Sequence, residues 1–136
     1  MLHKLIRIIL PLALPLPAFA SADTPSLIEE GRRLVEQVGM CIDCHSPRLP
    51  SGEFDRTRWL QGAPLGFKPV VEMPWMSYAP SLVGLPGYTD EQAIKFLTTG
   101  ERPGGVPVLP PMPPYRFNKS EATAILAYLR SLKPAE

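Results

Sequence analysis

Cysteine and histidine are scarce in this sequence, with two of each among its 136 residues. One of the histidines, His3, lies in an N-terminal leader that we expect to be removed. The three side chains that remain, Cys41, Cys44 and His45, fall within five residues of one another. Three soft ligands are too few for a structural zinc site, which needs four.

Runs of like charge and long runs of alternating β-branched residues are also absent. The chain has 14 basic and 13 acidic side chains. The expected leader removes Lys4 and Arg7 but no acid, so the mature chain would carry 12 basic and 13 acidic groups, a formal charge of −1. This balance gives no reason to expect a nucleic acid or an anionic membrane as partner. The valines at 70–71 and 106–108 are flanked by proline, so we expect extended loops there and no sheet.

The N-terminus has the order of a secretory signal peptide. Basic residues precede an apolar run over 8–19, and small residues follow it. The run is shorter than the roughly 20 residues that span a bilayer, and prolines interrupt it. We therefore expect cleavage after Ala20 or, preferably, Ala22, with 1–22 as the leader and 23–136 as one exported domain.

Proline is abundant, with 18 residues, and its clusters exclude long helices from 47–50, 64–86 and 103–114. Apolar residues at helical spacing predict a helix in each of the other segments, over about 25–39, 90–98 and 119–132. Thr24 is expected to cap the first helix, and capping boxes begin the others at Thr89 and Asn118. Three helices are too few to organise so much loop, so we expect something else to fill the centre of the domain.

The segment Cys41-Ile42-Asp43-Cys44-His45 has the spacing that attaches a haem covalently. Two thiols separated by two residues in one turn can reach the two vinyl groups on one side of a porphyrin, and His45 can then reach the iron. A redox dithiol also uses this spacing, but it is expected in a βαβ setting that this sequence lacks. A structural disulfide would suit an oxidising compartment but would leave the domain without a central filler. We therefore expect one haem c, held through Cys41 and Cys44.

The chain resembles a class I cytochrome c over nearly all of residues 25–133. Besides the haem motif after an N-terminal helix, the resemblance rests on the loop before the middle helix, the end of that helix, a methionine loop and the closing helix, at 79–85, 97–100, 111–115 and 124–132. It implies an all-α fold of about three main helices and proline-rich loops around one haem. It also implies that the first and last helices touch. We place that contact at Gly31 and Tyr128, because a glycine within a helix favours close approach.

The resemblance further implies that a methionine is the distal ligand of the iron. Met112 lies between two pairs of prolines, and such a stiff loop lowers the entropy cost of holding its sulfur. It also lies between the second and third helices, where the family carries its methionine. Met40 directly precedes the motif and is expected on the wrong side of the haem, whereas Met73 and Met76 stay open as alternatives.

A ligating histidine needs an acceptor for its second N–H. The resemblance assigns this role for His45 to the carbonyl of Pro80. Pro64 is a less favoured candidate, because it lies in a stretch that the resemblance does not cover. The stretch 46–78 is longer than in small members of the family. It is either a solvated loop over one haem edge, a partner-selecting loop, or the source of propionate donors at Arg58 and Trp59.

With two protein ligands, the iron would have no open position for a substrate, so we expect a carrier rather than a catalyst. The expected function is single-electron transfer between a donor protein and an acceptor protein in the bacterial periplasm, as in a respiratory chain, without stable membrane insertion after cleavage. A His/Met pair should give a raised reduction potential. Two alternatives stay open. One is a haem c subunit of a periplasmic dehydrogenase complex, which co-purification would reveal. The other is a haem-based gas sensor, which carbon monoxide binding would reveal.

Overall fold

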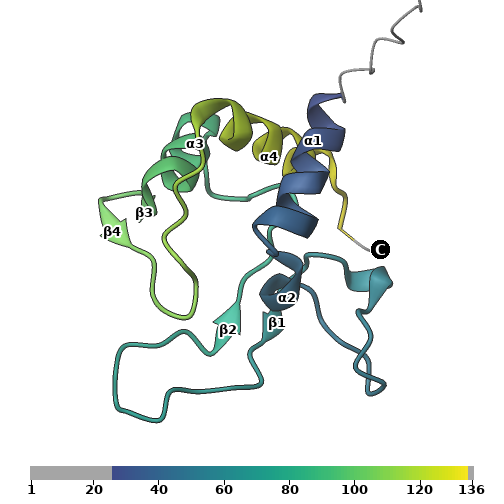
Figure 1. The fold of residues 1–136 in the computed structure, drawn as a ribbon, viewed down its shortest axis with the longest axis vertical. Helices are drawn as coiled ribbons and strands as arrows, with labels where there is room; N and C mark the ends of the chain where they lie inside the picture. The colour runs from purple at the N-terminus through teal and green to yellow at the C-terminus, as the bar shows by residue number, and fades with distance from the viewer. Residues whose placement is uncertain (1–25, 135–136) are drawn as a thin grey trace, which may run out of the picture.

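The computed structural model describes residues 26–134, so the expected leader, its cleavage site and the Thr24 cap lie outside the described residues. Helices supply most of the regular structure (Figure 1). In chain order they are α1 (Leu27–Arg33), its π-helical continuation η1 (Leu34–Val38), α2 (Ile42–His45), the 3-10 turn η2 (Arg56–Arg58), α3 (Asp90–Thr99) and α4 (Lys119–Ser131).

Short strands make the fold mixed rather than all-α. The antiparallel pairs are β1 (Ala63–Pro64) with β2 (Tyr78–Ala79), and β3 (Glu101–Arg102) with β4 (Val106–Pro107). The prediction of loop alone around 106–108 is therefore wrong. Two glycines with φ of 84° and 75° at positions 104–105 turn the chain back, and this local reversal pairs the residues on either side.

The sequence signals at the starts of α3 and α4 are confirmed. Complete capping boxes join Thr89 to Gln92 and Asn118 to Glu121, with side-chain contacts of 2.9 to 3.3 Å. Helix α1 begins later than predicted, because its cap is Ser26, whose Oγ accepts a hydrogen bond from a backbone N–H in the first turn.

Helices α1 and α4 cross in direct contact at Gly31, which confirms the predicted crossing. Gly31 is buried against α4. A Cβ atom at this position would lie 1.9 Å from the carbonyl oxygen of Ala124 and 2.8 Å from Cβ of Tyr128. Such distances are not possible between real atoms, so only glycine allows the two helices to approach this closely.

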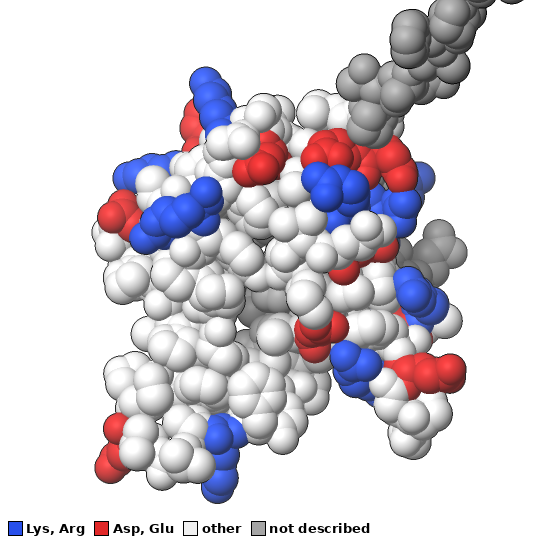
Figure 2. All heavy atoms as spheres, viewed as in Figure 1, with Lys and Arg blue, Asp and Glu red and all other residues white. Residues whose placement is uncertain are grey.

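The core joins η1, α3 and α4 on one side of the molecule, and the loop between β1 and β2 extends away from it (Figure 1). Its most deeply buried apolar side chains are Leu34, Val35, Leu60, Ala93, Ala122 and Ile125. The charged groups visible in Figure 2 lie mostly near the helices and at the outer edges of the face shown. Within residues 26–134, no helix has the length and apolar content needed to cross a membrane.

Candidate functional site

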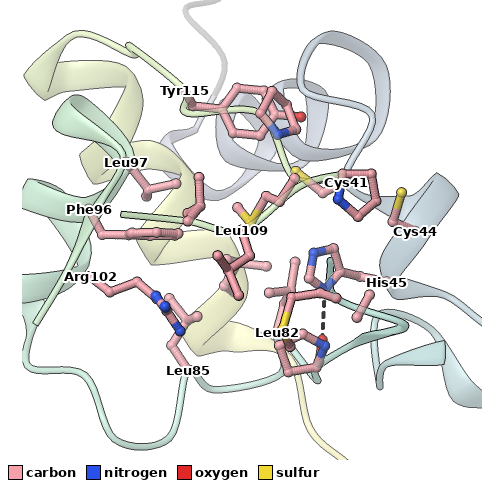
Figure 3. A pocket seen from close by; sticks show the side chains of 18 of the residues that line it. Cys41, Cys44, His45, Leu82, Leu85, Phe96, Leu97, Arg102, Leu109 and Tyr115 are labelled. Atoms are coloured by element: carbon pink, nitrogen blue, oxygen red, sulfur yellow. Dashed lines mark hydrogen bonds between the residues drawn. The ribbon is translucent and has the colours of Figure 1, made fainter. Parts of the chain in front are cut away.

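The Cys-x-x-Cys-His segment forms one helical turn, α2, with Cys41 as its N-cap; residues 39–41 connect it to η1. The backbone N–H of His45 donates to the carbonyl of Cys41 at 2.9 Å, which closes the turn. The N–H of Cys41 donates in turn to the carbonyl of Val35 at 2.9 Å. Both cysteines are free and line the same cavity as His45 (Figure 3).

His45 is 6% exposed and is fixed by one hydrogen bond. Its Nδ1 lies 2.6 Å from the carbonyl oxygen of Pro80 (Figure 3). A carbonyl can only accept, so Nδ1 carries the hydrogen and Nε2 keeps a lone pair. Burial lowers the pKa of His45, and the Pro80 carbonyl opposes this effect in part. The ring is thus held as a neutral imidazole with one nitrogen ready to bind a metal.

A close approach at Gly62 brings Pro80 to His45. The Gly62 N–H donates to the carbonyl of His45 at 2.8 Å, and the residue has a φ of 88°. A Cβ here would lie 2.8 Å from the carbonyl oxygen of Ala79 and 3.0 Å from the carbonyl carbon of Pro80. Glycine therefore lets β1 and β2 pair tightly enough to place the acceptor. No local signal in the sequence marks Gly62 as a site residue, since nothing near it shows which strands pair.

The cavity in front of His45 is lined almost wholly by apolar side chains (Figure 3). They come from α3, α4, the segment 76–85 and the segment 108–115. Burial raises the pKa of the Cys41 thiol to about 11 and also raises that of Cys44. The site therefore presents two uncharged thiols and one neutral imidazole to an apolar space at the centre of the domain, where the sequence predicted a filler.

Three of the four candidate methionines line this cavity: Met40, Met76 and Met112. Met73 is 41% exposed and is not among the lining residues. The structure thus brings the favoured ligand, Met112, and the alternative Met76 to the same space as His45.

Two contacts fasten the segment that carries Met112. On one side, the backbone N–H of Met76 donates to the carbonyl of Pro110 at 2.9 Å. On the other, the hydroxyl of Tyr115 donates to the carbonyl of Gly39, just before the cysteine motif. Burial raises the pKa of Tyr115 to about 12, so the hydroxyl remains a donor at neutral pH. Tyr115 therefore ties the loop 108–115 to the chain just before the cysteine motif, a contact that no local pattern in the sequence predicts.

Arg58 and Trp59 do not line the cavity. The Nε of Arg58 pairs with the carboxylate of Asp55 at 2.8 Å. The indole N–H of Trp59 donates to the hydroxyl of Tyr128 at 3.3 Å, and the Arg56 guanidinium lies 4.0 Å from its ring centre. The Arg58 pair thus lies within the loop 46–78, whereas Trp59 joins this loop to α4.

The donor set of the cavity fits a haem iron better than it fits another metal. No cluster of three or more His, Cys, Asp or Glu side chains within residues 26–134 could hold a metal ion. The cavity instead offers two thiols, an imidazole nitrogen and thioether sulfurs in an apolar setting. This combination suits a large apolar group with covalent tethers and an iron that accepts nitrogen and sulfur.

A comparison with known proteins points in the same direction. No protein-family model matches the chain. A segment of 36 residues is 53% identical to part of a protein described as "Diheme cytochrome c-type" from Cereibacter sphaeroides. The match covers 26% of this chain and 12% of that protein, so the chain spans only a small part of its relative. This similarity supports a relationship to c-type cytochromes.

Proposed function

We propose that this chain is a monohaem electron-transfer protein of the class I cytochrome c type. The observation that carries the proposal is the apolar cavity with the Cys41/Cys44 turn on its wall and the oriented imidazole of His45 beside it. Cys41 and Cys44 would hold haem c through thioether bonds, and His45 and Met112 would ligate the iron. When bound, the haem supplies an iron couple that accepts and releases single electrons.

The residues around the cavity have the roles that such a site needs. Pro80 keeps His45 in the tautomer that binds iron, and the fastened loop 108–115 holds a thioether at the same cavity. Apolar side chains exclude water, and a thioether ligand raises the reduction potential. With both axial positions taken by side chains, the protein would carry electrons between a donor and an acceptor protein rather than transform a substrate.

We place this activity in the periplasm. Two sequence features support this location. Residues 1–22 have the order of a secretory leader, and the paired thiols are the attachment points of a haem c, which would be joined to the chain outside the cytoplasm. The apo chain should be poorly folded, because it would lack the central filler of a small domain.

A second candidate is a haem c subunit of a periplasmic oxidoreductase complex. The observation that favours it is the match to a small part of a much longer dihaem protein. Purification of the native protein from its source would decide between the two. A stable complex with a second redox protein favours the subunit, and a lone chain favours the carrier.

Covalent attachment is the first test of the proposal. The holoprotein, made in a host with haem c maturation, should keep its haem on the polypeptide after extraction with acid and acetone. Cys41→Ser and Cys44→Ser should each lose one thioether bond and weaken maturation, and the double variant should release all haem to the solvent. Complete extraction of haem from the unmodified protein would overturn the assignment.

A further inference from the structure

The cavity wall contains one formally charged side chain. Among the described residues that line it, Arg102 alone carries a full charge at neutral pH, and the rest are apolar, aromatic or thiol side chains apart from the neutral imidazole. A cation facing an apolar space is unfavourable unless an anion accompanies it. Arg102 is half-buried at the cavity wall, so it offers a partner for a negatively charged group in this part of the cavity.

The β3–β4 hairpin fixes Arg102 in this place. The N–H of Gly105 donates to the carbonyl of Arg102 at 3.0 Å, and Arg102 pairs with Val106 across the hairpin. Its Nε lies 3.3 Å from the carbonyl oxygen of Pro107. Among residues 26–134, no carboxylate pairs with Arg102 and no acceptor meets its two terminal nitrogens. The guanidinium is thus held in position with its two terminal NH2 groups available.

Figure 3 shows Arg102 on the far side of the cavity from Cys41 and Cys44. The edge of a haem is divided in the same way, into an apolar half and a charged half. Its two vinyl groups lie on one half of the ring, and its two propionate carboxylates lie on the other. Thioether bonds at the cysteines would therefore direct the carboxylates away from α2 and toward β3. Guanidinium and carboxylate groups match in shape and charge and can form two parallel hydrogen bonds.

We propose that Arg102 binds a propionate carboxylate of the haem, so that the carboxylate end of the haem lies at the β3–β4 hairpin. This inference rests on the proposed haem function. It differs from the sequence-based interpretation that Arg58 and Trp59 in the loop 46–78 supply the propionate donors. Neither of those side chains lines the cavity, and Nε of Arg58 and the indole N–H of Trp59 already bond to Asp55 and Tyr128.

Other charged or titratable groups near Arg102 are engaged elsewhere or are uncharged. Glu101, its neighbour on β3, lies 3.6 Å from the ammonium of Lys95. Arg116 donates to the carbonyls of Pro114 and Tyr115. The tyrosines that line the cavity at 78, 88 and 115 contribute hydroxyl groups and no formal charge. A haem carboxylate would be part of the cofactor itself, so its ionisation would act on the iron more strongly than that of an exposed carboxylate such as Glu101.

The test measures the reduction potential of the holoprotein as a function of pH. Such a curve bends at the pH where a haem carboxylate ionises, and a nearby arginine lowers that pH. Removing the arginine should raise the pH of this bend by about one to three units. We therefore expect Arg102→Gln to lower the potential at neutral pH and to move the bend upward by this amount. Arg102→Lys should move it less, and Arg58→Gln, the matched control, should leave it in place.

Two results would overturn the proposal. One is an Arg102→Gln protein that retains covalent haem and the same iron ligands but whose potential curve bends at the same pH as that of the parent. The other is a moved bend in Arg58→Gln instead. An experimental structure of the unmodified holoprotein gives a second, independent readout if the glutamine variant does not mature. It should place a haem carboxylate within hydrogen-bond distance of the outer nitrogens of Arg102. Absence of covalent haem would refute the proposed function itself, which the extraction experiment detects separately.

Discussion

Replacing Gly31 by alanine should destabilise the protein, although alanine is the better helix former. The propensity difference favours alanine by about 1 kcal/mol in the middle of a helix. The added methyl group, however, would lie 1.9 Å from the carbonyl oxygen of Ala124 and 2.6 Å from its carbonyl carbon. Both atoms are backbone of α4, so no side chain can rotate out of the way.

The size of this effect follows from how far the helices must separate. A Cβ rarely comes nearer than 3.0 Å to another heavy atom, so α1 and α4 would have to move apart by about 1 Å from the 1.9 Å contact. Overpacking of this kind costs about 3 kcal/mol, at the upper end of the usual range. After the gain in helix propensity, we expect a net loss of about 2 kcal/mol, which is roughly a thirty-fold change in the unfolding equilibrium.

Denaturant and thermal unfolding of the holoprotein, followed by far-UV circular dichroism, would measure this loss. The midpoint temperature should fall by roughly 10 °C. Gly66→Ala is the matched control, because a Cβ at Gly66 meets no atom within 4 Å, and its stability should stay within about 0.5 kcal/mol of the parent. A Gly31→Ala protein that is as stable as the parent would show that the close contact between α1 and α4 is wrong.

Two further predictions concern the iron ligand and the acid stability. Met112→Ala should abolish the weak far-red sulfur-to-iron absorption band of the oxidised protein, lower its reduction potential and let carbon monoxide bind the reduced form. Met76→Ala should change none of these, and the opposite pattern would assign the ligand to Met76. Hydrogen bonds from Thr57 and then Arg58 lower the pKa of Asp55 from 3.8 to about 2. The carboxylate therefore stabilises the fold fully above pH 3.8, and this contribution is lost as the pH falls toward 2. Asp55→Asn should be less stable at neutral pH, and its stability should depend less on pH between about 4 and 2. Parallel pH dependences in the two proteins would argue against this role.

Local signals in the sequence were sufficient for the starts of α3 and α4 and for the helical turn at the cysteine motif. The capping boxes at Thr89 and Asn118 join residues three apart, so their geometry does not depend on the rest of the fold. The Cys-x-x-Cys-His spacing likewise acts within one turn of helix. Gly31 is a special case. Its presence in a helix indicated a close approach, but the family resemblance was needed to name Tyr128 as the partner.

The groups that complete the site depend on contacts between distant segments, and the tertiary structure decided those. The pairing of β1 with β2, which needs glycine at position 62, carries Pro80 to His45. The sequence could suggest Pro80 only by resemblance, because no local pattern reports a contact between a turn of helix and a loop so far along the chain. The same reasoning applies to the arginines. Arg58 follows the motif in sequence but pairs with Asp55, whereas Arg102 reaches the cavity because the tight turn after it reverses the chain. The sequence thus determined the groups that lie within one helical turn of each other. Only the tertiary fold determined which of the distant arginines lines the cavity.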